Sequence, residues 1–271
     1  MSDSIETFEA SRRRLLSIAY RMLGSMAEAE DIVQETWLRW HEVRHEVLET
    51  PVAWLTTVTT RLAIDRLRRV RRERAAEGDW LPEPWLGDAP SAEDTVSRLC
   101  ELSYGVLLLL ERLSPDERAA LLLYEVFDAS HADIARILGR KVEHCRQLVH
   151  RARERMKGPA GPTRRPARDG GAELAGAFVT AIRAHDEAAM LRLLAPAVVL
   201  AGDWASTGPT AVAAALLDCA AGMTCLLAGI NGGWGVLLRR GRIELAVSLE
   251  LDGEFVTAVY AVAPRRSAVF A

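Results

Sequence analysis

Lysine is almost absent from this chain of 271 residues, because only Lys141 and Lys157 occur among its 34 basic side chains. Nearly every cation is therefore arginine, whose planar guanidinium suits bidentate contact with phosphates and guanine edges. The four cysteines form no CxxC pair, which argues against a zinc site and favours a reducing compartment. We therefore expect no metal, no cofactor and a cytoplasmic location.

Long apolar stretches are also missing, since runs such as residues 106–110 fall far short of a membrane span. The first ten residues carry Asp3, Glu6 and Glu9 and no apolar core, so we expect no secretory signal. With 49% hydrophobic and 26% charged residues, the composition is that of a folded protein. The length indicates two domains or three small ones, and we expect no contact with a membrane.

The formal net charge of −3 argues at first against nucleic-acid binding, but the charge is unevenly distributed. Residues 61–74 hold seven arginines against two acidic residues, and residues 136–157 hold eight basic residues against two acidic ones. Acidic residues gather elsewhere, at positions 28–35 and 77–101. Because net charge says nothing about local charge, the two arginine-rich segments are candidate nucleic-acid contacts. Two solvated helix faces are the alternative interpretation.

Helix start signals are frequent in the first 157 residues and predict an all-helical region. Most are capping boxes, in which a serine is followed three residues later by Glu or Asp, and one is a Thr-Pro pair. The signals begin at Ser25, Thr50, Ser91, Ser114 and Ser130. Segments 75–90 and 158–171 are rich in proline and glycine, a composition typical of linkers.

Residues 130–155 predict a helix-turn-helix, with Gly139 at the break, where a positive φ is commonly needed. The second helix has an apolar face and an arginine-rich polar face, which fits a helix that reads the major groove. Arg146 and Gln147 have suitable chemistry for guanine and adenine edges. A helical hairpin with a solvated basic face is the alternative.

After residue 172 the pattern becomes that of an α+β domain. Helices are predicted at residues 173–184, 187–194 and 209–217, and strands at 198–201, 225–230, 234–239, 243–251 and 255–262. Glycine-containing turns between the last four strands favour a meander of hairpins. The polar residues His185, Asp203, Asp218 and Glu244 show no catalytic pairing, so we expect no enzyme. A small-molecule ligand in the apolar interior, near Trp204 or Trp234, remains an open alternative.

Taken together, these stretches resemble the extracytoplasmic-function (ECF) branch of the sigma-70 family of RNA polymerase sigma factors. Residues 15–24 (LLSIAYRMLG) and 27–40 (AEAEDIVQETWLRW) resemble regions 2.1 and 2.2 of that family. Residues 51–72 (PVAWLTTVTTRLAIDRLRRVRR) resemble regions 2.3 and 2.4, and residues 113–125 with 130–156 resemble region 4. Their order and spacing, rather than any single motif, carry the resemblance.

The resemblance implies a multidomain fold, with two all-α helical domains (sigma region 2 and the helix-turn-helix sigma region 4) plus a C-terminal α+β SnoaL-like domain. The motif WLPEPW at residues 80–85 resembles an element of the subgroup that carries this extension. The implied segments are residues 1–75 (region 2), 76–104 (linker with WLPEPW), 105–158 (region 4), 159–171 (Pro/Gly linker) and 172–271 (SnoaL-like regulatory extension).

The implied function is a sigma factor that binds core RNA polymerase, recognises −10 and −35 promoter elements and promotes DNA melting. The implied partners are promoter DNA and the clamp helices of the largest catalytic subunit of the polymerase. The fused extension would regulate the sigma regions in cis, so that a separate anti-sigma factor is not required. The alternative is a helix-turn-helix transcription regulator with a ligand-binding α+β domain that never touches polymerase.

The resemblance also assigns roles to residues at matching positions. Core polymerase would contact Asp31, Gln34, Glu35 and Leu38. The −10 element would face Asp65, Arg66, Arg69 and Arg72, and the loop at residues 45–50 would receive a flipped base. The −35 element would be read by His144, Arg146, Gln147, His150 and Arg151, with Arg153 and Arg155 nearer the DNA backbone. The interdomain regulatory residues would be Trp80, Leu81, Pro82, Glu83 and Pro84.

Overall fold

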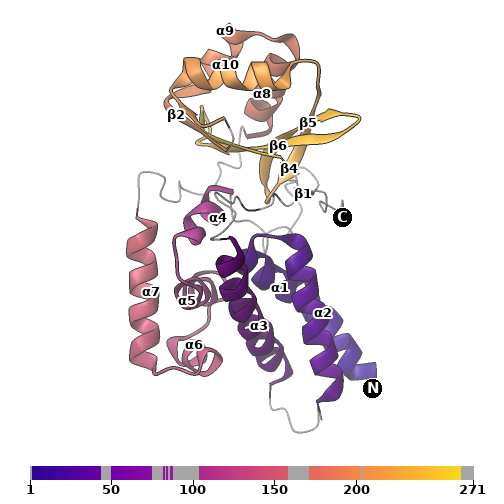
Figure 1. Cartoon of the computed structure of the whole chain (residues 1–271), viewed down its shortest axis with the longest axis vertical. Coiled ribbons are helices and arrows are strands. Elements are labelled where there is room, and N and C mark those ends of the chain that lie inside the picture. Colours follow the sequence, from indigo (N-terminus) through magenta and orange to yellow (C-terminus); the bar gives the residue numbers. More distant parts are fainter. Residues whose placement is uncertain are drawn as a thin grey trace. The chain divides into compact units, whose positions relative to one another are not determined.

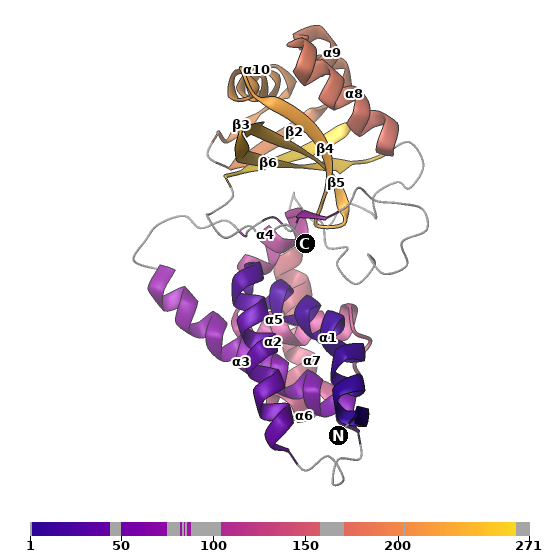
Figure 2. The ribbon, with the colours of Figure 1, turned by 90° about the vertical axis from the view of Figure 1, so that its right-hand side faces the viewer.

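The computed structural model (Figures 1 and 2) describes residues 2–43, 50–74, 82, 84, 86–87, 104–157, 171–202 and 204–263. Its contacts divide the chain into two compact units. Unit 1 comprises Met1–Pro82 and Leu109–Pro159, and unit 2 comprises Glu83–Leu108 and Ala160–Ala271. No helix within the described residues is both long and apolar enough to cross a membrane.

Unit 1 begins with three helices that pack against one another, as the sequence predicts. They are α1 (Ser2–Leu23), α2 (Met26–Glu42) and α3 (Pro51–Arg74). Their apolar faces meet around Leu15, Val33, Trp40 and Leu55, all of which are buried. The indole nitrogen of Trp40 donates a hydrogen bond of 2.9 Å to the carbonyl of Ser4, which ties the end of α2 to the start of α1.

Four further helices follow, and three of them lie wholly within unit 1. They are α4 (Tyr104–Glu111), α5 (Pro115–Glu125), α6 (His131–Leu138) and α7 (Val142–Met156). The capping boxes predicted at Ser114 and Ser130 are both present, each with its two reciprocal hydrogen bonds. Gly139 ends α6 with a φ of 64°, which confirms the predicted break.

The two groups of helices in unit 1 pack directly against each other. Helix α3 contacts both α5 and α6, and α1 contacts α5. Regions 2 and 4 of the sequence interpretation, expected as two helical domains, therefore share one compact unit in this structure.

Unit 2 is an α+β domain in which three helices cover one face of a seven-stranded sheet (Figures 1 and 2). The helices are α8 (Gly171–Ala184), α9 (Glu187–Leu193) and α10 (Pro209–Ala220). The strands are β1 (Leu86–Gly87), β2 (Leu194–Gly202), β3 (Ser206–Thr207), β4 (Thr224–Ile230), β5 (Gly233–Arg240), β6 (Arg242–Leu251) and β7 (Val256–Val262).

The sheet order is β1-β4-β5-β6-β7-β2-β3, so the last four strands form the predicted antiparallel meander. Only the β2–β7 pair is parallel among the strands described. Alternate residues along the strands point to the helices and build the main core, including Val236, Leu238 and Val247. The opposite face carries a smaller apolar cluster with Leu237, Ala246 and, from the segment before region 4, Leu86.

One local expectation is wrong, and one group of polar side chains is placed by distant contacts. Ser25 is the N-cap residue of α2, but its side chain makes no capping hydrogen bond, because Glu28 binds Arg66 on α3 instead of completing the box. The threonines of α3 are largely buried, and the hydroxyl oxygens of Thr59 and Thr36 lie 3.1 Å apart. Partners distant in sequence decide both positions.

Candidate nucleic-acid interface

Helix α7 presents one apolar and one polar face, and the apolar face fixes its orientation on unit 1. Cys145, Leu148, Val149 and Ala152 are buried. The residues predicted to read DNA are all exposed, and none forms a hydrogen bond or ion pair with another described residue. They are His144, Arg146, Gln147, His150 and Arg151. These five polar side chains lie together on one helix face, and they are available to contact base edges if the helix enters a DNA major groove.

Arg153 and Arg155 are placed differently from the rest of the polar face. Arg153 pairs with Glu125 on α5 at 2.6 Å, and its guanidinium lies 5.0 Å from the ring centre of Tyr124. Its hydrogen bond to Glu125 raises the pKa of Arg153. Arg155 pairs with the buried Glu117, which also lies on α5. These two arginines hold α7 against α5, which leaves the first three turns of α7 as the free face.

The −10 candidates on α3 divide into engaged and free side chains. Arg66 forms a bidentate pair with Glu28 of α2, and this hydrogen bond raises the pKa of Arg66. Asp65 pairs with Arg68 at 3.1 Å, and Arg72 donates to the carbonyl of Arg68 at 3.2 Å. Arg69 is exposed and has no hydrogen bond or ion pair within the described residues.

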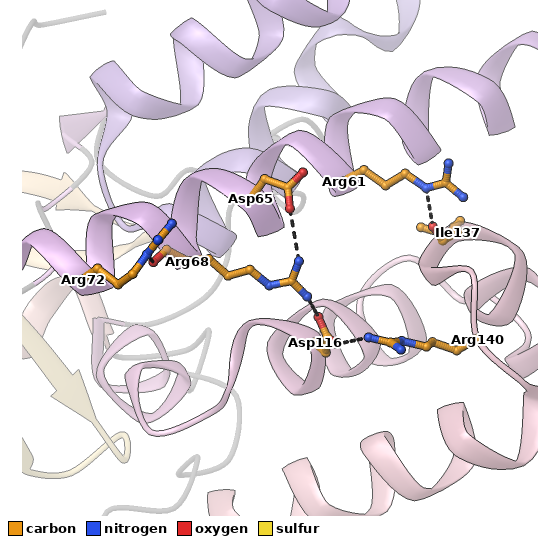
Figure 3. A network of polar contacts seen from close by, with 7 residues as sticks. All are labelled: Arg61, Asp65, Arg68, Arg72, Asp116, Ile137 and Arg140. Atoms are coloured by element: carbon orange, nitrogen blue, oxygen red, sulfur yellow. Dashed lines mark hydrogen bonds and ion pairs between the residues drawn. The ribbon is translucent and has the colours of Figure 1, made fainter.

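A polar network that sequence reasoning missed joins α3 to α5 and α6 (Figure 3). Arg68 pairs with Asp116 at 2.7 Å, and Asp116 also forms an ion pair with Arg140 at 3.3 Å. Arg61 donates to the carbonyl oxygens of Ile137 at 2.7 Å and of Arg136 at 3.2 Å, at the end of α6. The arginine-rich part of α3 is therefore in contact with the helix-turn-helix rather than with solvent alone.

A buried arginine joins α5 to α1 and to α4. Arg118 on α5 is only 1% exposed. It donates to the carbonyl of Met22 on α1 at 2.8 Å and pairs with Glu111 on α4 at 2.9 Å. No local sequence signal marks these partners, because Met22 and Arg118 are 96 positions apart.

The polymerase candidates on α2 lie mainly on its outer surface. Asp31, Gln34 and Leu38 are exposed, and Leu38 keeps 54% of its accessible surface. Glu35 is half-buried and pairs with Arg39 at 2.9 Å. Beside them lies a groove of about 470 Å³ between α1 and α2. It is lined by Phe8, Glu9, Arg12, Leu16, Glu30, Val33, Gln34 and Trp37.

Some predicted site residues lie outside the described part of the chain. They are Trp80, Leu81, Glu83 and most of the loop at residues 45–50. Pro82 and Pro84 are described and buried. Within the described residues no group of three or more His, Cys, Asp or Glu side chains is arranged to hold a metal ion.

Comparison with known proteins links this arrangement to transcription. Residues 7–73 match the family profile of sigma-70 region 2, and residues 105–156 match that of sigma-70 region 4. The chain is 39% identical over 219 residues to the ECF RNA polymerase sigma factor SigJ of Mycobacterium tuberculosis. These 219 residues cover 78% of this chain and 68% of SigJ. It is 34% identical over 152 residues to the probable ECF RNA polymerase sigma factor SigI of that species, covering 55% of this chain and 52% of SigI.

The likeness extends to the C-terminal α+β part. The crystal structure of the M. tuberculosis extracytoplasmic function sigma factor SigJ aligns with a TM-score of 0.76 and 31% identity, and the alignment covers 96% of each chain. Two helical regions followed by a sheet-containing extension are therefore common to both proteins.

Proposed function

Because the chain belongs to the extracytoplasmic-function branch of the sigma-70 family of RNA polymerase sigma factors, we propose that α7 reads the −35 element and α3 faces the −10 element. The observation that carries the first assignment is the free polar face of α7, with its five exposed side chains. Arg146 and Gln147 supply the donors and acceptors that distinguish guanine and adenine in the major groove.

At the −10 element, Arg69 contacts DNA without losing an existing partner. Arg66 first has to exchange Glu28 for a phosphate, so its role depends on a rearrangement of α2 and α3. Asp65 and Arg72 lie on the same exposed stretch of α3. The loop at residues 45–50 receives the flipped base during melting, at an unstacking cost of about a few kcal/mol that polymerase helps to offset.

Core polymerase docks on the exposed surface of α2 through Asp31, Gln34, Glu35 and Leu38. An exposed leucine beside a groove and two carboxylates suits an interface with an apolar centre and a polar rim. Its partner on the polymerase is the clamp helices of the largest catalytic subunit.

The packing of α3 on α5 and α6 within unit 1 supports a closed state of the free protein, in which regions 2 and 4 lie too close together to engage both promoter elements. Centres of elements at −10 and −35 are separated by about 25 base pairs, which is on the order of 80 Å of duplex. Arg61 on α3, however, is hydrogen-bonded to the end of α6 at 2.7 Å. Regions 2 and 4 must therefore separate when polymerase binds, and the extension regulates that step in cis.

The polymerase-binding surface is tested by equilibrium titration of labelled full-length protein with core polymerase. Leu38→Asp places a charge in the centre of the proposed interface, and we expect at least tenfold weaker binding. Leu191→Asp is the matched control, because Leu191 is also an exposed helical leucine but lies on α9 of the extension. Equal affinities of the two variants would remove α2 from the interface.

A further inference from the structure

The sheet of unit 2 binds a segment that precedes region 4 in the chain. Strand β1 pairs antiparallel with β4, so that Leu86 faces Ile230 and Gly87 faces Gly229. Leu86 is only 7% exposed and packs with Ile230, Leu237 and Ala246 on the sheet face that α8–α10 leave uncovered. A strand taken from more than a hundred residues away thus covers the edge of the sheet, as an added peptide does in β-augmentation.

The start of α4 makes a second contact with the same sheet. Tyr104 is 1% exposed, and its ring centre lies 5.5 Å from that of Tyr260 on β7. A Cβ atom at Gly105 would lie 2.5 Å from the Tyr260 hydroxyl oxygen and 3.2 Å from Oε1 of Glu250 on β6. Glycine is a poor helix former, and here its missing side chain lets the helix backbone reach the two polar groups.

The surroundings of Tyr260 are consistent with a tightly packed contact. Burial raises the pKa of Tyr260 to about 12, and the nearby Glu250 adds to this effect. The phenol is therefore neutral at physiological pH, and no charged group on Tyr260 opposes the close approach of Gly105.

We propose that the uncovered sheet face is a binding surface for β1 and for the start of α4 of this same chain, and that this contact is how the extension controls the sigma regions. We call it the linker latch, and define it by Leu86, Tyr104 and Gly105 bound to β4, Glu250 and Tyr260. The region 4 match begins at residue 105, so the latch holds the first residue of region 4 itself. Release of the latch frees region 4 to move away from region 2, and this mechanism rests on the sigma function proposed above.

Gly105→Ala tests the latch without weakening α4, because alanine is the better helix former. Its methyl group enters the space next to the Tyr260 hydroxyl and forces the two elements apart. In the full-length protein we expect amide hydrogen exchange of the peptide 104–111 to become at least fivefold faster, with α7 unchanged. Gly176→Ala is the matched control, because a Cβ at this position of α8 meets no atom within 4 Å.

A second variant distinguishes a lost contact from general misfolding. Tyr260→Phe removes the oxygen that lies nearest to the new methyl group, so the double variant Gly105→Ala/Tyr260→Phe should recover part of the lost protection. Exchange in Gly105→Ala equal to that of Gly176→Ala would overturn the latch. A double variant that exchanges as fast as, or faster than, Gly105→Ala would overturn the role of Tyr260.

Transcription with core polymerase then tests control. With limiting protein, we expect Gly105→Ala to raise promoter-dependent transcript three- to tenfold over wild type, while Gly176→Ala stays within twofold. Faster exchange without a change in transcription would refute control through the latch. If wild type directs no transcript, the sigma function itself fails, and the exchange experiment still decides whether Tyr260 holds α4.

Discussion

Arg118 joins three helices through one guanidinium, since its partners lie on α1 and α4 while it belongs to α5. Burying an arginine is unfavourable unless its donors are satisfied. The Met22 carbonyl accepts a hydrogen bond from Arg118, and Glu111 supplies the opposite charge at 2.9 Å. Glu111 also lies 3.7 Å from Arg71 of α3. The charge is thus used to fix how α1, α4 and α5 meet.

Replacing Arg118 by Met should destabilise the protein. The change leaves the Met22 carbonyl and Glu111 without this donor, at a cost on the order of 2–3 kcal/mol. Urea unfolding followed by far-ultraviolet circular dichroism measures the difference. Arg112→Met is the control, because Arg112 is exposed, and we expect a change within about 0.5 kcal/mol. Equal midpoints for the two variants would show that Arg118 is dispensable.

A second prediction for a single residue concerns Arg146, which we propose reads a base of the −35 element. In the complex with core polymerase, Arg146→Ala should lose about 1–3 kcal/mol of discrimination at one −35 base pair. Competition binding with promoter variants substituted at each −35 position measures this loss. Arg192→Ala removes an exposed arginine of α9 and should leave base preference unchanged. An unaltered preference in Arg146→Ala would show that this side chain reads no base.

At the scale of elements, sequence reasoning succeeds where the determinant is local. The capping boxes at Ser114 and Ser130, the break at Gly139 and the strands of the meander each depend on residues a few positions apart. The predicted polar face of α7 is exposed for the same reason, because its apolar periodicity alone orients the helix.

Other features could not be predicted because their partners are distant. Glu28 does not take part in a capping box, because its carboxylate accepts hydrogen bonds from Arg66, 38 positions away. Asp116 joins Arg68 and Arg140 across two helical regions that the sequence presents as separate. Strand β1 has only two residues and owes its conformation to β4, so no periodicity marks it. The packing of α3 on the helix-turn-helix is therefore a finding of the structure.

The contact of α3 with α5 and α6 makes a prediction for the free protein. Asp116→Asn keeps the shape of the side chain and removes the charge that holds Arg68 and Arg140. Because Arg68 is 45% exposed, each pair contributes only about 0.2–1 kcal/mol, so duplex DNA should bind two- to fivefold more tightly. Fluorescence anisotropy at low salt measures the change.

Asp218→Asn is the control for the general effect of one lost negative charge, because Asp218 lies on α10 of the extension and is exposed. If both variants gain affinity equally, the gain reflects net charge, and the network around Asp116 does not restrain DNA binding.

At the scale of the whole molecule, one chain combines sigma-70 regions 2 and 4 with an α+β extension, an arrangement shared with SigJ. Free protein should bind promoter duplex poorly, because regions 2 and 4 are packed together in unit 1. Tight, salt-sensitive binding should require polymerase, which separates the regions and lets each add to the affinity of the other. Specific duplex binding by the free chain at about nanomolar concentration would contradict this expectation.

Chains ending at Lys157 and at Val262 test the role of the extension at this scale. Loss of all residues after Lys157 removes the sheet strands that pair with β1, whereas the end at Val262 keeps every strand that the structure describes. We expect the first truncation to change promoter activity and the second to change it less. Identical activity of both truncations and the full chain would exclude regulation in cis.

Direction of core RNA polymerase to promoters through regions 2 and 4 can be tested without assuming any promoter sequence. The most direct measurement is transcription of genomic DNA by purified core polymerase with and without the full-length protein, followed by sequencing of the transcript 5′ ends. We predict a discrete set of start sites that depend on the protein and share one −35 and one −10 motif. The absence of any start site that depends on the protein would show that this chain does not direct polymerase to promoters.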